Sequence, residues 1–318
     1  MIIDTRIRPP YKGFAGGSNY SREKPAKWAA MFGGKVAPSV QHAPERFEKG
    51  EHDVILKECL AEMDEAGIDF AFVPGRKGQD QVWIDNQDVV DLCDEYPDRF
   101  AGIASICHED PMEYNLDQIK KFCIDGPLYG VSIETGLVSD IPTAIPRFVD
   151  DPLFWPIYDL CEKNNVVVSF THNGPAYPDP SGSDPVRLKH IYSDFPNLKT
   201  LLVHGSWPHV NEIAAYLFVN KNVMVQPDFY MMHAAGWQGY VDSINYMNPE
   251  NYVFSSSYPL ADMKTMVEYY LNCGIKEEIL PNLFYKNAAR FFGIDAKKVK
   301  RLPNSPIKDE FDDVIVVK

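Results

Sequence analysis

The sequence lacks the patterns that mark several common classes of protein. It has no run of about 18 apolar residues, so we expect no membrane-spanning helix, and its N-terminus shows no signal-peptide pattern. The formal net charge of -14 disfavours binding to nucleic acid or to an anionic membrane. The six cysteines include no CxxC pair, which favours reduced thiols and a cytoplasmic protein. Neither a glycine-rich phosphate loop nor a GxSxG motif supports a nucleotide-binding or serine-hydrolase function.

Short apolar segments alternate with longer amphipathic segments along the 318 residues. This alternation is typical of βα units that build a parallel sheet. Eight candidate strands are present, which is the number that a closed barrel needs. They are Ile2–Asp4, Phe70–Val73, Phe100–Ser105, Gly130–Ile133, Val166–Thr171, Thr200–Val203, Val223–Val225 and Tyr252–Phe254. We therefore predict an α/β fold of the (β/α)8 TIM-barrel type.

The segments between the strands predict helices over 52–66, 85–96 and 151–164. Residues 9–50 are rich in proline and glycine and show little periodicity, so we predict a long loop insertion after strand 1, over the barrel mouth. We expect residues 1–302 to form a single barrel domain and residues 303–318 to form a C-terminal tail.

The first predicted strand continues into Asp4-Thr5-Arg6-Ile7-Arg8. Side chains two apart on a strand point to the same side, so Arg6 and Arg8 should face one space. Two guanidiniums there offer forked donors to a carboxylate or phosphate, which predicts a small anionic substrate. The alternative is that both arginines only pair with internal acids, of which Asp4 and Glu134 are the obvious candidates.

Other polar side chains follow the predicted strands at the barrel end where active sites occur. His172 and His204 each follow an apolar strand, and neutral imidazole suits proton transfer near pH 7, so we predict catalytic roles for both. Nearby arginines would lower the pKa of a histidine and favour its neutral form, which can act as a base. Glu134 suits either a general acid/base or an arginine counter-ion. The predicted substrate-binding residues are Arg6, Arg8, Arg76, Glu134, Asp228 and Ser257.

Four ordered segments resemble the amidohydrolase-related (amidohydrolase family 2) barrels. They are Asp151–His172, Leu201–Ser206, Phe254–Pro259 and Tyr285–Gly293. That group includes aminocarboxymuconate semialdehyde decarboxylase, resorcylate-type decarboxylases and some lactonases. The resemblance implies a metal-dependent-hydrolase-like barrel, with His172 and His204 at the places of two metal ligands. The chain departs from the family pattern where Arg6-x-Arg8 replaces the first-strand HxH motif and where Ser257 replaces the strand-8 aspartate.

These departures bear on the cofactor. Arginine has no acceptor lone pair, and a dication about 6 Å from one guanidinium is repelled by about 5 kcal/mol at an effective dielectric near 20. We therefore predict no cofactor. The alternative is a divalent metal, zinc or manganese, held by His172, His204 and a loop acid such as Asp228 or Glu134.

The resemblance leaves two classes of function open. The first is an enzyme, a hydrolase or carbon–carbon lyase such as a decarboxylase, that acts on a small carboxylated substrate, which could be aromatic or a lactone. The second is a catalytically inactive homologue that binds or senses a small molecule. Retention of two histidines and replacement by arginines favour the enzyme. The acidic surface and the aromatic-rich loops are compatible with a homodimer.

Overall fold

The structure, a computed structural model, describes residues 1–12, 20–21, 23–77, 84–135, 147–177 and 179–307. Its centre is a parallel sheet in which seven strands follow one another in sequence order. The strands are β1 (Ile3–Asp4), β2 (Phe70–Pro74), β3 (Phe100–Ile106), β4 (Gly130–Ile133), β5 (Val167–Thr171), β6 (Thr200–Val203) and β7 (Val223–Gln226). All of their residues are buried, as expected for a parallel sheet covered by helices. The predicted parallel α/β architecture is confirmed.

The eighth predicted strand, Tyr252–Phe254, is not a strand in the structure. It forms one isolated parallel bridge between Tyr252 and Val225 of β7. On its other side, the carbonyl of Phe254 accepts hydrogen bonds from the backbone N and Oγ1 of Thr5 at 3.0 and 2.8 Å. This segment therefore joins β7 to the end of β1 with too few ladder bonds to count as a strand.

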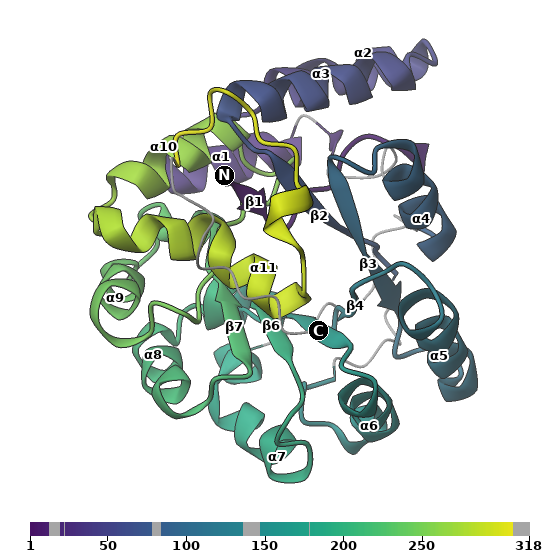
Figure 1. The fold of residues 1–318 in the computed structure, drawn as a ribbon, viewed down its shortest axis with the longest axis vertical. Helices are drawn as coiled ribbons and strands as arrows, with labels where there is room; N and C mark the ends of the chain where they lie inside the picture. Colours follow the sequence, from purple (N-terminus) through teal and green to yellow (C-terminus); the bar gives the residue numbers. More distant parts are fainter. Residues whose placement is uncertain (13–19, 22, 78–83, 136–146, 178, 308–318) are drawn as a thin grey trace.

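Helices surround the strands as a ring (Figure 1). They are α1 (Glu23–Phe32), α2 (Pro38–Glu48), α3 (His52–Ala66), α4 (Asn86–Glu95), α5 (Met112–Ile119), α6 (Trp155–Lys163), α7 (Val186–Asp194), α8 (Val210–Val219), α9 (Gln238–Asp242), α10 (Met263–Asn272) and α11 (Asn287–Phe292). The predicted helices over 52–66, 85–96 and 151–164 correspond to α3, α4 and α6. Helix α3 ends at Gly67, whose φ of 73° is the left-handed geometry that glycine tolerates. None of the helices in the described ranges is long and apolar enough to cross a membrane.

The region from residue 9 to residue 50 differs from the predicted loop. Helices α1 and α2 lie within it, so the insertion is helical over much of its described length. Proline at Pro25 and Pro38 made the segment look irregular, but both residues stand in the first turns of these helices, where proline costs no hydrogen bond. Trp28 and Phe32 of α1 pack on Phe229, with ring centroids 4.9 and 5.2 Å apart.

The described part of the C-terminal segment returns to the start of the chain. The amino group of Met1 donates to the carbonyl of Ile307 at 2.6 Å. Asn304 donates to the carbonyl of Asp64, and Pro306 lies against Gly67. Residues 303–307 therefore pack at the amino ends of the first strands, opposite the end that carries the polar side chains.

Candidate active site

A small cavity of about 140 Å³ lies at the carboxyl ends of the strands. Active sites of α/β barrels occupy this end because the loops that follow each strand meet there. The lining residues are Arg6, Arg8, Lys24, Trp28, Arg76, Glu134, Thr171, Asn173, Pro175, Ala176, His204, Phe229 and Leu260. Five of the eight predicted site residues are therefore brought together: Arg6, Arg8, Arg76, Glu134 and His204.

Glu134 lies between two of the arginines. Its Oε1 atom is 3.2 Å from Nη2 of Arg8, and its Oε2 atom is 3.4 Å from Nη2 of Arg76. All three side chains are buried. The expectation that an internal acid pairs with the arginines thus holds for Arg8 and Glu134. Among the described lining residues, four are cationic (Arg6, Arg8, Lys24 and Arg76) and one is acidic, so the cavity has a positive excess.

Arg6 makes different contacts. Its Nη1 atom lies 3.2 Å from Nε2 of His204 and 3.3 Å from Oγ of Ser257. Ser257 Oγ in turn donates to Oδ2 of Asp228 at 2.9 Å. Nδ1 of His204 lies 2.5 Å from the same oxygen, but the angle of this contact is not that of a hydrogen bond. Because a guanidinium only donates, Nε2 of His204 must be the acceptor, and the ring proton is assigned to Nδ1, toward Asp228. Asp228 and Ser257 therefore contact the cavity through His204 and Arg6.

The electrostatic environment fixes the charge states of two groups in the cavity. Burial lowers the pKa of His204 below its ordinary 6.5, and the Arg6 guanidinium lowers it further, against the opposing effect of Asp228. Burial alone would raise the pKa of Glu134, but the guanidiniums of Arg76 and Arg8 hold it below its usual value. At neutral pH His204 is therefore a neutral base and Glu134 is ionised.

The backbone of this cluster is strained. His204, Asp228 and Ser257 have φ angles of 70°, 46° and 55°, in the left-handed region that residues with a side chain rarely adopt. His204 follows β6, Asp228 follows β7 and Ser257 follows the bridged segment Tyr252–Phe254, and the three side chains contact one another through Asp228. Such strain costs about 1–3 kcal/mol per residue and concentrates at functional sites. Its coincidence with the polar network supports this cavity as the active site.

Asp4 does not line the cavity, but it connects two backbone segments beneath it. Its carboxylate accepts the backbone N–H of Arg6 at 3.0 Å and that of Ser256 at 3.1 Å. Burial raises the pKa of Asp4 to about 7, although these hydrogen bonds favour the ionised form. Asp4 thus links the end of β1 to the segment that carries Ser257. It does not pair with the Arg6 side chain, which was the alternative that the sequence left open.

His172 is not among the lining residues of the cavity. Thr171 and Asn173 line it, and the extended backbone turns the side chain between them to the opposite side. His172 is fully buried, and its Nδ1 atom lies 2.8 Å from Oγ of Ser206. Burial lowers its pKa to about 3, so the ring is neutral at physiological pH. The structure therefore separates the two predicted catalytic histidines.

Several lining residues were missed by sequence reasoning. Lys24 and Trp28 come from α1, and no local pattern connects that segment with the barrel mouth. Asn173 could have been found, because alternation from Thr171 along the extended chain places it on the same side. Phe229 and Leu260 supply apolar walls and carry no signal beyond their positions after β7 and after Ser257.

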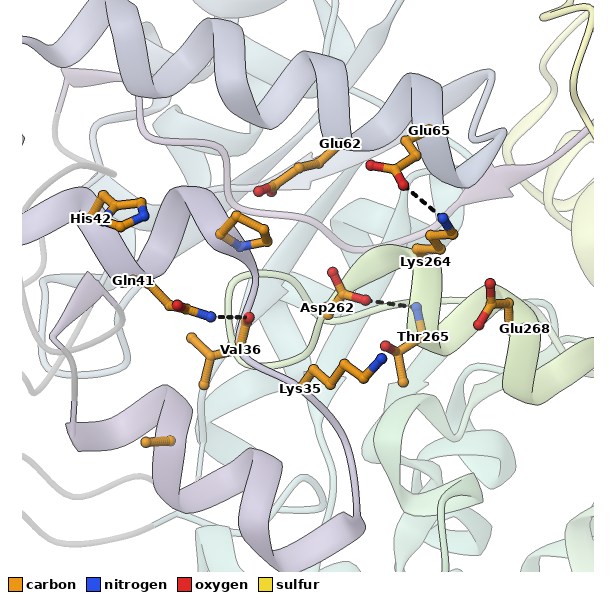
Figure 2. Close-up of a pocket in the computed structure, with 12 residues that line it drawn as sticks. Lys35, Val36, Gln41, His42, Glu62, Glu65, Asp262, Lys264, Thr265 and Glu268 are labelled. Atoms are coloured by element: carbon orange, nitrogen blue, oxygen red, sulfur yellow. Dashed lines mark hydrogen bonds and ion pairs between the residues drawn. The ribbon is translucent and has the colours of Figure 1, made fainter.

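A larger groove, of about 1020 Å³, is separate from this cavity (Figure 2). Residues of α2, α3 and α10 line most of it, and none of the predicted site residues does. Two of its carboxylates have partners within the groove: Glu65 pairs with Lys264 at 2.6 Å, and Asp262 accepts the backbone N–H of Thr265 at 2.7 Å. Size therefore does not identify the active site here, whereas convergent buried charges do.

The sequence model of the amidohydrolase family matches residues 35–294, which is most of the chain. The protein therefore belongs to the amidohydrolase family, as the four sequence segments predicted. No curated protein matches the sequence.

Solved structures share the fold. An uncharacterized TIM-barrel protein from Bordetella bronchiseptica is 28% identical with a TM-score of 0.82, over 92% of this chain and 98% of that chain. A 2,6-dihydroxybenzoate decarboxylase from Rhizobium is 18% identical with a TM-score of 0.60, over 74% of this chain and 87% of its own. A dihydroxybenzoic acid decarboxylase from a Polaromonas species was solved with bound manganese and the inhibitor 2-nitroresorcinol. It is 16% identical with a TM-score of 0.63, over 94% of this chain and 98% of that chain.

The donor set of this cavity does not fit a divalent cation such as the manganese of the Polaromonas enzyme. The Arg6 guanidinium lies 3.2 Å from Nε2 of His204, the nitrogen that would have to bind the metal. His172 does not line the cavity. Within the described ranges, no cluster of three or more histidine, cysteine or acidic side chains could hold a metal ion. A fixed positive charge thus lies where a cation would need an electron pair.

Proposed function

We propose that the protein is an enzyme that binds a small carboxylate through Arg6, Arg8 and Arg76 and transfers a proton through His204, without a divalent metal. The observation that supports this most is the convergence of three guanidiniums and a neutral imidazole on one buried cavity. Guanidiniums recognise carboxylates through paired hydrogen bonds, and the positive excess compensates the charge of a bound anion.

The size of the cavity limits the substrate. Its volume of about 140 Å³ is close to the roughly 150 Å³ of an engineered apolar cavity that holds one benzene molecule. Trp28, Phe229 and Leu260 supply apolar walls beside the arginines. A carboxylate of about one ring fits this combination, in agreement with the dihydroxybenzoate on which the Rhizobium relative acts.

Each residue then has a chemical role. The arginines hold the carboxylate and stabilise negative charge that develops during the reaction. His204 accepts or delivers a proton at Nε2, after Arg6 shifts from that nitrogen to the substrate anion, and Asp228 stabilises the imidazolium that forms. Ser257 bridges Arg6 and Asp228. The acid that the family pattern expects on strand 8 is thereby supplied by Asp228 after β7. Decarboxylation and hydrolysis of a lactone or amide both need this proton transfer.

We also propose that residues 1–302 fold as one barrel domain with the insertion over its mouth, and that residues 303–318, of which 308–318 lie outside the described residues, form a tail. The finer resemblance to aminocarboxymuconate semialdehyde decarboxylase belongs to the same proposal. It rests on the segments around His172, His204 and Ser257, and the two arginines of the first strand distinguish this chain from that enzyme.

The first test is a screen of small carboxylates, with calorimetry for binding and carbon dioxide release or proton uptake for turnover. The panel includes benzoate, 2,6-dihydroxybenzoate and carboxylated lactones. We expect Arg6→Met to weaken binding of the best ligand by about 1.5–3 kcal/mol, or roughly 10- to 150-fold, because a charged hydrogen bond is lost. Arg290→Met, at a half-exposed position, is the control and should bind normally. Tight Arg6-dependent binding with no turnover of any ligand would instead identify an inactive binding homologue.

The second test is metal content, measured by mass spectrometry on protein purified without chelators or a metal-affinity tag. We expect less than about a tenth of an equivalent of zinc or manganese, because Arg6 faces the nitrogen that would ligate it. Activity should also survive dialysis against a chelator. Near-stoichiometric metal that is required for turnover would refute the metal-free mechanism.

A further inference from the structure

The turn that carries His204 has an unusual backbone. His204, Gly205 and Ser206 are consecutive, and their φ angles are 70°, 68° and 61°. Left-handed geometry is sterically unfavourable for a residue with a side chain, and runs of such residues are rare. This turn therefore needs contacts from outside itself to keep its shape.

Two parts of the fold provide those contacts. On one side, the end of β5 binds Ser206: the carbonyl of His172 accepts its N–H at 2.9 Å, and Nδ1 of His172 lies 2.8 Å from its Oγ. On the other side, the hydroxyl of Tyr240 in α9 donates to the carbonyl of Gly205 at 2.9 Å. The same hydroxyl would lie 2.7 Å from a Cβ at residue 205, so the turn is tightly enclosed.

We propose that His172 is a positioning residue for His204. Its side chain binds the hydroxyl of Ser206 and thereby holds the left-handed turn in the shape that directs Nε2 of His204 into the cavity and Nδ1 to Asp228. This assignment rests on the proposed role of His204 in proton transfer. It replaces direct catalysis by His172, whose ring points away from the cavity.

The geometry distinguishes a positioning role from simple filling of the core. An apolar side chain would fill the space of His172 but would offer Ser206 no partner, and the Ser206 hydroxyl is itself fully buried. The free-energy penalty of a buried hydroxyl without a partner is of the same order as the strain in one residue of the turn. Loss of the His172–Ser206 contact can therefore change the conformation of the turn while the barrel stays folded.

The experiment follows the ring nitrogens of His204 by ¹⁵N NMR of histidine-labelled protein at pH 7.5, with the His204 signals assigned through His204→Asn. In the wild type we expect a protonated Nδ1 and an unprotonated Nε2. Ser206→Ala and His172→Leu should move both nitrogen shifts toward the average of the two tautomers, because the ring loses its fixed contact with Asp228. His172→Asn, whose amide can replace Nδ1, should restore the wild-type shifts.

His42→Asn is the matched control, because His42 is an exposed residue of α2, and it should leave the His204 signals unchanged. Ser206→Ala removes a single hydroxyl, so it decides the question if His172→Leu fails to fold. Wild-type His204 shifts in folded Ser206→Ala would overturn the proposal, and so would equal perturbation by His172→Asn and His172→Leu. If the shifts respond as expected but no carboxylate is turned over, the positioning role stands and the proposed function fails.

Discussion

Replacement of His204 by glutamine lowers kcat by about 10²- to 10⁴-fold, the usual contribution of a positioned general acid or base. The reason is that the neutral ring of His204, held between Arg6 and Asp228, is the proton acceptor in the proposed mechanism. Steady-state kinetics on the substrate found in the screen measures this loss. In the wild type, the acid limb of the kcat/KM profile should lie below pH 6.5, because burial lowers the pKa of His204 and keeps the base form present down to lower pH.

His42→Gln serves as the control for this experiment, because it makes the same change in an exposed helix position and should keep full activity. Binding of the substrate to the His204 variant should be weakened much less than turnover, since Arg8 and Arg76 are unchanged. More than a tenth of wild-type kcat in the His204 variant would show that another group transfers the proton.

Glu134→Gln should have the second large effect, a loss of about 3–5 kcal/mol in the free energy of unfolding. Glu134 forms buried ion pairs with both Arg8 and Arg76, and breaking a buried ion pair by removing one member is strongly destabilising. The same change makes the cavity more positive, so benzoate should bind about 2 kcal/mol, or roughly 30-fold, more tightly at an effective dielectric near 20. Urea unfolding and calorimetry measure the two effects.

The opposite signs of these effects make the test specific. Saturating benzoate should recover part of the lost stability in Glu134→Gln, because a ligand that binds only the folded state stabilises it. Glu250→Gln breaks an exposed pair with Arg290 and should change stability by less than about 1 kcal/mol. A variant of Glu134 that is as stable as the wild type and binds benzoate no better would mean that this carboxylate does not neutralise the arginines.

Sequence reasoning located the barrel strands well because each is a short apolar segment between polar turns. Seven of them match within a few residues, since a parallel sheet covered by helices needs continuous burial along each strand. The eighth predicted strand, Tyr252–Phe254, was wrong. This segment is apolar because it is buried, but its backbone makes only one bridge. The loop predicted for residues 9–50 was also wrong, because prolines in the first turn of a helix look like helix breakers in the sequence.

The positions of site residues could be predicted from the sequence where they depend on a single strand. Alternation along the first strand placed Arg6 and Arg8 together, and the positions of Arg76, Glu134 and His204 after their strands placed them at the same end. The prediction that His172 lies in the site followed the family resemblance. Alternation along the extended chain instead directs Thr171 and Asn173 to the cavity. Contacts such as Glu134 between Arg8 and Arg76 depend on three segments far apart in the chain, and no local pattern encodes them.

The left-handed backbone at His204, Asp228 and Ser257 also bears on how this protein can evolve or be engineered. A search for stabilising substitutions would favour glycine at these positions, because glycine adopts such geometry without steric cost. Each such change would remove a member of the polar network that contacts Arg6. Thermostability and catalytic competence therefore compete at the same three residues, and a variant selected for heat resistance alone is liable to lose its chemistry there first.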